Sequence, residues 1–442
     1  MIASAAPVAP LASHQLLLFL LEVGVLLLLA VILGRLAQRF GLPAVVGELL
    51  TGILLGPSLL GQLAPSVGHW LLPGEPSQMH LLDALGQFSV VLLVGVAGLH
   101  VDLRLIRRRA GTVATVTMGG LLLPLGLGVA TGLLVPAALL AATDQRVMFA
   151  FFLGVAMAVS AVPVIAKTLT DMRLMHRDVG QLILAAASLD DAFAWFMLSL
   201  ISSMAVSALT VGNVLASLLN LVLFIVAAAL IGRPVVRRAM RWANAQIDVG
   251  PAVAIAVVTV LLFSAAGHAL GLEAIFGALV AGVLLGLPGG VEPARLAPLR
   301  TVVLSVLAPL FLATAGLRVD LRALADPVVL VAGLVILVLA VLGKFCGAYL
   351  AGRLTRQSHW EAVALGAGLN SRGVVEIVIA MVGLRLGILN TATYTIVVLV
   401  AVLTSVMAPP MLQRAMRRIE HNAEEALREE NQAQLITRPV VR

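Results

Sequence analysis

Thirteen segments of this chain are apolar and long enough to cross a lipid bilayer, which takes about 20 mostly apolar residues in a helix. Because a lipid interior satisfies no backbone polar group, each segment is expected to form a helix. The segments lie near residues 15–34, 43–63, 81–99, 111–138, 146–169, 179–206, 212–232, 251–270, 272–288, 298–316, 328–352, 360–384 and 389–411. The pair within 251–288 is joined so tightly that one member could be re-entrant. The sequence therefore predicts an all-α polytopic membrane protein with about 13 transmembrane helices.

The composition agrees with this prediction and excludes several classes of protein. Hydrophobic residues make up 61% of the chain and charged residues only 12%, whereas soluble domains carry about 25% charged residues. The single cysteine, Cys346, excludes an internal disulfide framework, and no zinc-site spacing is present. A phosphate loop of the GxxxxGK[ST] type is also missing from the sequence, which disfavours an ATP-driven pump. We expect no cofactor, no nucleic-acid partner and no nucleotide-binding domain.

The basic residues predict the orientation of the helices. Of the 29 lysines and arginines, 23 fall in loops after odd-numbered segments or in the C-terminal tail, and only Arg146, Arg318, Arg322 and Arg385 fall on the other side. Cytoplasmic loops carry the excess of basic residues. The N-terminus is therefore expected outside, with residues 1–14 as a short leader, and the tail at 413–442 in the cytoplasm. The expected location is the plasma membrane of a bacterium.

Two short segments recur along the chain. AGLHVDLR at 97–104 returns as AGLRVDLR at 315–322, and GELLTGILLG at 47–56 resembles GALVAGVLLG at 277–286. Chance similarity between apolar helices is an alternative, mainly for the second pair. The two copies of the first pair are seven segments apart, so they fall at opposite faces of the membrane. This pattern indicates an inverted-topology repeat, which is typical of secondary transporters with a site near mid-membrane.

Two of the segments that this repeat relates contain residues that a regular membrane helix avoids. Segment 146–169 contains Pro163, and segment 360–384 contains Asn370, Ser371, Arg372, Gly373 and Glu376 in its middle. Irregular backbone at membrane depth is tolerated where it is buried in protein or lines a wet cavity. The matched pair therefore predicts two discontinuous helices at a binding site, with helix breaks at Pro163 and Gly373. A proline kink with small residues for close packing is the alternative.

Charged residues inside the predicted helices are the candidates for chemistry. Asp190 and Asp191 lie in the middle of segment 179–206, and adjacent helical residues point about 100° apart, so the two carboxylates face different neighbours. Lys344 lies past the middle of segment 328–352 and could either reach back toward mid-depth or extend to the cytoplasmic interface. Arg372 and Glu376, four residues apart, are expected to pair and to hold the broken helix in shape rather than to bind substrate.

These motifs together resemble the monovalent cation/proton antiporter superfamily, in particular the branch with bacterial sodium/proton and potassium/proton antiporters and plant cation/proton exchangers. The resemblance covers residues from about 15 to 412 and rests on six motifs in order. They are VGELLTGILLGPSLLG at 46–61, the AGLxVDLR pair, AVSAVPVIAK at 158–167, SLDDAFAW at 188–195, GKFCG at 343–347 and NSRGVVEI at 370–377.

The resemblance implies a fold and a set of site residues. It implies a transmembrane domain at 15–412 with a core near 111–206 and 328–411, two crossed broken helices, and scaffold helices mainly in 15–63 and 212–288 that form a homodimer. Asp191 matches the family's cation- and proton-binding carboxylate. Asp190 matches the variable position before it, Lys344 its charge partner, and Ser160 a polar contributor to the cation site. The family often has a second polar residue beside Ser160, where this chain has Val159 and Ala161, which leaves the cation selectivity open.

The expected function is transport rather than enzyme catalysis. We expect exchange of a monovalent cation, Na⁺ before Li⁺ or K⁺, for protons, with Asp191 as the cation ligand, in an electrogenic cycle with elevator-type alternating access. An electroneutral potassium/proton exchanger is the alternative within this class. An ion channel and an intramembrane aspartyl protease are less favoured, because the polar residues cluster at one depth and the two aspartates are adjacent on one helix.

Overall fold

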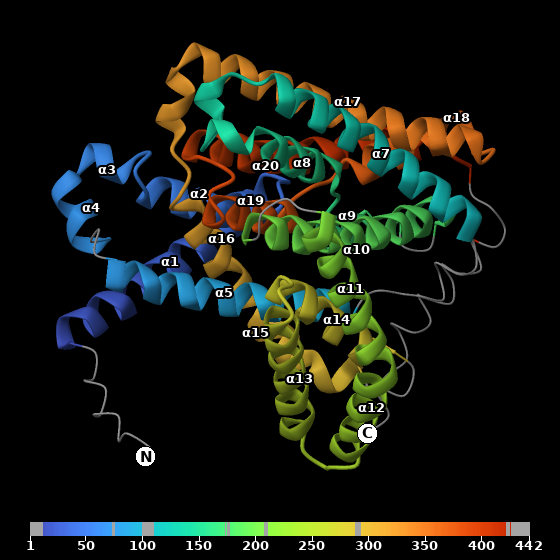
Figure 1. The fold of residues 1–442 in the computed structure, drawn as a ribbon, viewed down its shortest axis with the longest axis horizontal. Helices are drawn as coiled ribbons and strands as arrows, with labels where there is room; N and C mark the ends of the chain where they lie inside the picture. Colours follow the sequence, from blue (N-terminus) through green and yellow to red (C-terminus); the bar gives the residue numbers. More distant parts are fainter. Residues whose placement is uncertain are drawn as a thin grey trace. The chain divides into compact units, whose positions relative to one another are not determined.

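The computed structural model describes residues 12–72, 76–99, 110–172, 174, 177–206, 211–287, 293–420 and 425. The described chain is helical, with one isolated bridge between Leu140 and Leu389 (Figure 1). Residues 1–11 of the expected leader, residues 100–104 of the first repeat copy and most of the tail after residue 420 lie outside the described residues. The helices divide into two compact units.

The first unit contains Met1–Val90 and Leu304–Asp320. Its core is formed by Leu26, Ala30, Leu82, Leu310 and Ala313. Its helices are α1 (Ser13–Arg39), α2 (Ala44–Leu55), α3 (Leu60–Leu63), α4 (Pro65–Leu71), the first part of α5 (Pro76–Gly98), and α16 (Ala308–Gly316), which follows a π-helical turn, Val303–Leu307.

The second unit contains Val91–Val303 and Leu321–Arg442. Its apolar core joins side chains of α7, α9, α10, α17, α18 and α20. Its helices are the rest of α5, α7 (Ala110–Leu134), α8 (Arg146–Ala158), α9 (Val162–Asp171), α10 (Asp178–Val206), α11 (Val211–Ala227), α12 (Arg233–Asn244), α13 (Gly250–Ala269), α14 (Ala274–Gly286), α15 (Ala297–Val302), α17 (Pro327–Leu354), α18 (His359–Leu369), α19 (Val374–Arg385) and α20 (Thr391–Met416). The π-helical turn Ala228–Gly232 joins α11 to α12, and short 3₁₀ turns lie at Ala137–Leu139, Thr143–Gln145, Pro293–Leu296 and Leu321–Ala325.

Every predicted membrane segment coincides with helical structure. Ten helices among the described residues are long and apolar enough to cross a membrane, and the bent pair α18 and α19 makes an eleventh candidate span. The two remaining segments are α14, a shorter apolar helix, and the pair α8 and α9, which is interrupted between Ala158 and Val162. The prediction of an all-α polytopic membrane protein is confirmed.

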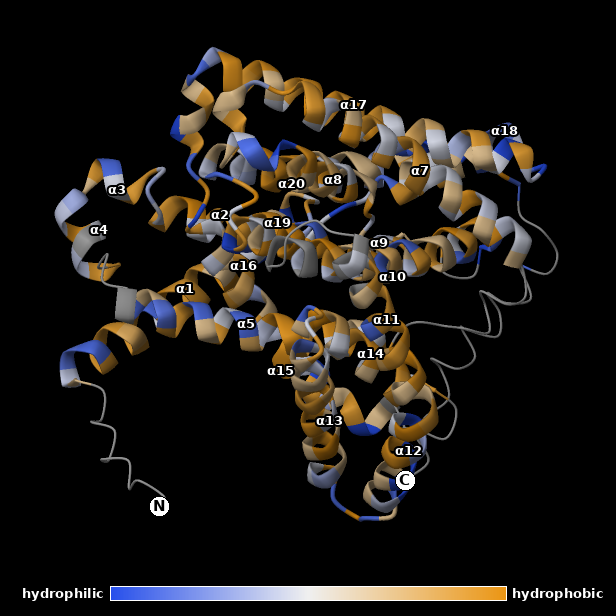
Figure 2. Ribbon diagram, viewed as in Figure 1, coloured by the Kyte–Doolittle hydropathy of each residue, from blue (hydrophilic) through white to orange (hydrophobic). Residues whose placement is uncertain are grey.

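The surface of the helices is apolar, as a lipid environment requires. On α17 the large side chains of Leu334, Val338 and Leu342 are about half exposed, at 53%, 51% and 51%. The opposite face of this helix buries small residues such as Ala340 and Gly347. In Figure 2 apolar colouring runs along the helices, and polar colouring gathers at turns such as the one between α12 and α13. Small residues inside and large apolar residues outside are typical of packing in membranes.

Glycine contacts repeat at equivalent positions of the two repeat copies. In the first unit, a Cβ added at Gly316 would lie 3.0 Å from Cα of Gly52, and in the second unit a Cβ at Gly98 would lie 3.0 Å from Cα of Gly282. Gly52 and Gly282 are the same position of the GELLTGILLG motif, and Gly98 and Gly316 the same position of the AGL motif. Each motif therefore packs against the other motif of the opposite copy, which explains why glycine is present at all four positions.

We predict that Gly282→Ala destabilises the protein, because the new Cβ would lie 2.9 Å from Cα of Gly98 and in contact with the Gly95 carbonyl oxygen. Overpacking of this kind costs about 1–3 kcal/mol. Thermal unfolding in detergent, followed by tryptophan fluorescence, measures the effect. Gly126→Ala in α7 is the control, since nothing lies within 4 Å of its added Cβ and alanine is the better helix former by about 1 kcal/mol. A midpoint for Gly282→Ala equal to that of wild type would contradict the close packing.

Candidate functional site

Two interrupted helices cross at the centre of the second unit. The first breaks after Ala158, runs extended through Val159 and resumes at Val162, so that Pro163 is the second residue of α9, where a missing N–H disrupts no helical hydrogen bond. The second breaks between Leu369 and Val374, with a bend of 42°. The prediction of two discontinuous helices is confirmed, with the first break just before Pro163.

The two breaks are joined by hydrogen bonds. The Ala161 N–H donates to the Ser371 carbonyl at 3.0 Å. The Ser160 hydroxyl oxygen lies 2.7 Å from the carbonyl oxygen of Leu369, the last residue of α18. The last carbonyls of a helix have no partner within it. The break between α8 and α9 therefore supplies a hydrogen bond to the C-terminal end of α18.

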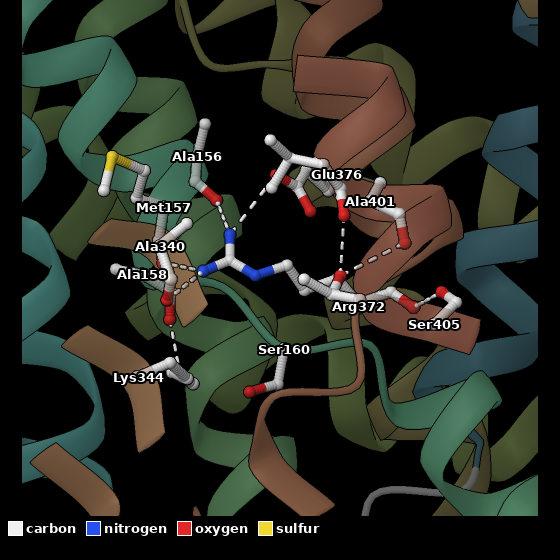
Figure 3. A network of polar contacts seen from close by, with 12 residues as sticks. Ala156, Met157, Ala158, Ser160, Ala340, Lys344, Arg372, Glu376, Ala401 and Ser405 are labelled. Carbon is white, nitrogen blue, oxygen red and sulfur yellow. Dashed lines mark hydrogen bonds and ion pairs between the residues drawn. The ribbon is translucent and has the colours of Figure 1, made fainter. Parts of the chain in front are cut away.

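The C-terminal end of α8 is capped by two cationic side chains. The Arg372 guanidinium donates to the carbonyl of Ala156 at 2.9 Å and to that of Met157, and the Lys344 ammonium donates to the carbonyl of Ala158 at 2.5 Å (Figure 3). The C-terminal end of a helix carries a partial negative charge, so cations there are favourable. The unpaired carbonyls of the broken helix thus become ligands for the two buried positive charges.

Arg372 also connects the break to three further helices. Its guanidinium donates to the Ala340 carbonyl of α17 at 3.2 Å and pairs with Glu376 Oε1 in the first turn of α19 at 3.2 Å. The hydroxyl of Ser405 in α20 donates to the Arg372 carbonyl. The side chains of Arg372 and Glu376 are 0% and 2% exposed. The expected pairing of Arg372 with Glu376 is therefore present, and Arg372 has no exposed surface for a ligand. The structural role of the pair stays a prediction.

The side chain of Lys344 points into the protein and does not extend to the cytoplasmic interface, the alternative that the sequence left open. Its Nζ lies 2.6 Å from Oδ2 of Asp190, and both side chains are fully buried. The same carboxylate oxygen lies 2.7 Å from the hydroxyl of Ser160. Asp190, Lys344 and Ser160 therefore form one hydrogen-bonded group between α10, α17 and the first break.

Asp191 lies beside this group but has different partners, as the helical geometry predicted. Its carboxylate accepts the backbone N–H of Val162, at the N-terminal end of α9, where the helix dipole favours a negative charge. Its Oδ1 has no hydrogen-bond partner. Asp191 lines a cavity together with Ser188 and Trp195 of α10 and apolar side chains of α5, α9, α14 and α19.

The charges of the site are unbalanced. Three buried carboxylates, Asp190, Asp191 and Glu376, accompany two buried cations, Lys344 and Arg372. Lys344 pairs with Asp190 and Arg372 pairs with Glu376. Among the described residues, Asp191 is the carboxylate of this group without a cationic side chain in contact. A buried carboxylate without a counter-charge is costly, so this position favours a proton or a cation from solution.

The structure brings all the predicted site residues to this crossing. The side chains of Asn370 and Ser371 are buried at the second break, with polar atoms that have no hydrogen-bond partner, and Gly373 precedes α19, where an added Cβ would lie 2.6 Å from the Val164 side chain. The prediction did not include Ser188, although its place three residues before Asp191 puts it on the same helix face.

Comparison with known proteins places these features in a family. Residues 24–418 match the family described as sodium/hydrogen exchanger, transmembrane. The Na⁺/H⁺ antiporter NhaS4 of Synechocystis is 29% identical over 406 residues, which cover 90% of this chain and 97% of that protein. The Na⁺/H⁺-K⁺ antiporter GerN of Bacillus cereus is 28% identical over 395 residues, 89% of this chain and 95% of that one. Cation/H⁺ antiporter 17 of Arabidopsis thaliana is 29% identical, and this chain spans 48% of its length.

A solved structure shares the fold. The sodium proton antiporter MjNhaP1 from Methanocaldococcus jannaschii superposes with a TM-score of 0.66 at 15% sequence identity, over 91% of this chain and 97% of that one. The family match covers nearly all the membrane helices, and the crossed broken helices carry the motifs on which the resemblance rests. This chain belongs to the sodium/hydrogen exchanger family and is an integral membrane antiporter of monovalent cations and protons.

Proposed function

We propose that this protein exchanges Na⁺ for protons at Asp191, by an electrogenic cycle that exports the cation from the cytoplasm as protons enter. The observation that carries the proposal is that Asp191 is buried, lines a cavity and has no cationic side chain in contact among the described residues, while Asp190 and Glu376 each have one. The relatives NhaS4, a Na⁺/H⁺ antiporter, and GerN, a Na⁺/H⁺-K⁺ antiporter, both have sodium in their names, which supports sodium as the cation. The basic residues support a cytoplasmic C-terminus.

The exchange follows from competition for one carboxylate. A hard cation that leaves water needs oxygen ligands, preferably charged ones, and the unpaired Oδ1 of Asp191 supplies one. A proton on the same carboxylate removes its charge and weakens cation binding. Because proton and cation exclude one another at Asp191, each crossing of the membrane carries one or the other, and the two fluxes are coupled.

We predict that Asp191→Asn abolishes exchange, because an amide neither binds a proton at this site nor neutralises a cation. The assay uses everted membrane vesicles, in which addition of Na⁺ should collapse an imposed pH gradient for wild type. Li⁺, K⁺ and Rb⁺ in the same assay give the selectivity. Asp144→Asn, an exposed aspartate in a turn before α8, is the matched control and should transport normally. Sodium-dependent collapse of the gradient by Asp191→Asn at the wild-type rate would contradict the role of Asp191.

The pair of Asp190 with Lys344 supports electrogenic exchange. In our proposal Lys344 pairs with Asp190 in the cation-free state, and cation binding at Asp191 competes with that pair, so that Lys344 releases a second proton. Two protons then exchange for one monovalent cation, and one net charge crosses the membrane per cycle. A net charge couples to the membrane potential by about 2.3 kcal/mol per 100 mV.

We predict that Lys344→Gln reduces the response of transport to voltage, because the variant lacks the second proton carrier. Flux is measured in proteoliposomes with and without a clamped potential, and wild type should accelerate when the potential favours entry of positive charge. Arg300→Gln, at an exposed position of α15, is the control and should respond as wild type does. A wild-type flux that does not change with the clamped potential would favour the electroneutral potassium/proton exchanger. An unchanged voltage response in Lys344→Gln would reject the role of this lysine.

A polar cluster away from Asp191 offers a place to test alternating access. Glu273, directly before α14, accepts hydrogen bonds from Arg385 at the end of α19, at 3.0 Å, and from Ser202 of α10, at 2.8 Å. Along these three helices the cluster lies about 9–21 Å beyond the residues that line the cavity of Asp191. In our proposal α10 and α19 move relative to α14 during transport, so this Glu273 cluster must open once per cycle.

We predict that a covalent link across the Glu273 cluster stops transport. Cysteines replace Ser202 and Glu273 in a Cys346→Ser background, which removes the native cysteine, and a short bifunctional thiol reagent joins them. Exchange should stop after cross-linking and return when a cleavable reagent is reduced. Each single-cysteine variant treated with the same reagent is the control. Normal exchange by the cross-linked protein would exclude movement of α10 against α14.

A further inference from the structure

The cavity at Asp191 contains a second oxygen on the same helix. Its lining is apolar except for Ser188, Asp191 and Trp195, all from α10. Ser188 precedes Asp191 by three residues, so the two side chains lie on one helix face about 5–6 Å apart at their Cβ atoms. Ser188 is 4% exposed and Asp191 6%. Two oxygen-bearing side chains thus share a cavity that offers an ion little other polar surface.

The hydrogen bond of Ser188 determines what its hydroxyl offers to that cavity. The hydroxyl donates to the Leu184 carbonyl one turn earlier, at 2.8 Å. A serine hydroxyl has one hydrogen and two lone pairs. Because the hydrogen is committed to the backbone, the oxygen remains as an acceptor. An acceptor of this kind suits a cation, and it needs no rearrangement when the ion arrives.

Ser160, the serine expected to contribute to the cation site, is differently placed. Its oxygen lies 2.7 Å from Oδ2 of Asp190 and 2.7 Å from the Leu369 carbonyl, so two acceptors compete for its single hydrogen. Ser160 is fully buried and is absent from the cavity lining. Its contacts join the two breaks to the Asp190 and Lys344 pair.

We propose that the Ser188 hydroxyl oxygen is a direct ligand of the transported cation, next to the Asp191 carboxylate, and that it contributes to cation affinity and selectivity. The inference rests on the proposed role of Asp191. A neutral oxygen replaces one of the water oxygens that a partly dehydrated cation has lost, whereas a proton on Asp191 needs no such ligand. Ser188 therefore favours the cation over the proton at the same carboxylate.

The test compares Ser188→Ala with Ser188→Thr, which keeps the hydroxyl. Loss of one oxygen ligand of the bound cation should raise the Na⁺ KM about 10-fold, an effect as large as that of losing one hydrogen bond to a charged group, with kcat little changed. The threonine variant should retain a KM near wild type. At low Na⁺ concentration, protons should compete with Na⁺ for Asp191 more strongly in Ser188→Ala than in wild type. Exchange by this variant should therefore begin at a higher pH. The relative KM values for Li⁺, Na⁺, K⁺ and Rb⁺ should also change.

Ser89→Ala is the matched control. Ser89 is a fully buried serine of α5 that donates to the carbonyl four residues earlier, Leu85, at 2.7 Å, as Ser188 does to Leu184. It does not line the cavity. If Ser188→Ala is not produced as folded protein, Ser188→Cys replaces the oxygen by a soft sulfur at similar size and should also raise the Na⁺ KM.

The outcomes separate this inference from the proposed function. The ligand role would be overturned if Ser188→Ala had the wild-type KM for every cation. It would also be overturned if Ser89→Ala raised the KM as much as Ser188→Ala does. In both cases wild type would still exchange cations for protons, so the proposed function would stand. Sodium-dependent exchange that survives Asp191→Asn would instead overturn the proposed function itself.

Discussion

The carbonyl groups freed by the break after Ala158 are the constraint on which the site depends. Arg372 and Lys344 donate to the last three carbonyls of α8, and this anchors two positive charges on fully buried side chains. The same break points the N-terminal end of α9 at Asp191 through the Val162 N–H. One interruption of the backbone thus provides a negative helix end for cations and a positive helix end for a carboxylate. An unbroken helix would offer neither end at this depth.

The inverted repeat explains how two such breaks meet. Segment 360–384 is the counterpart of segment 146–169, and each supplies a helix end that the other caps. Ser160 bonds the end of α18, while Arg372 of the second break bonds the end of α8. The glycines of the repeated motifs allow the supporting helices to approach closely, in the first unit at Gly52 and Gly316 and in the second at Gly98 and Gly282.

The main features of the site were predictable because charge is costly in a membrane. Asp190, Asp191, Lys344, Arg372 and Glu376 were recognisable as buried charges in apolar segments, and helical geometry required the two adjacent carboxylates to face different neighbours. Hydrogen-bond direction and cavity lining were not predictable. Ser160 and Ser188 look alike as serines in apolar helices, yet the first contacts Asp190 and Leu369 and the second lines the cavity of Asp191. The homodimer expected from the resemblance stays a prediction.

The sequence by itself determined that the chain is a bundle of membrane helices, that two of them are broken and that a small set of charges lies at their centre. Length, apolarity and the cost of unpaired backbone in lipid are properties of each segment alone, so they can be read along the chain. The family resemblance implied that Lys344 pairs with Asp190, but the residues by themselves left the direction of Lys344 open, and only the tertiary structure decided which carboxylate has a cationic partner. That pairing depends on contacts between residues such as Asp190 and Lys344, 154 positions apart, whose distance is fixed only when the helices pack.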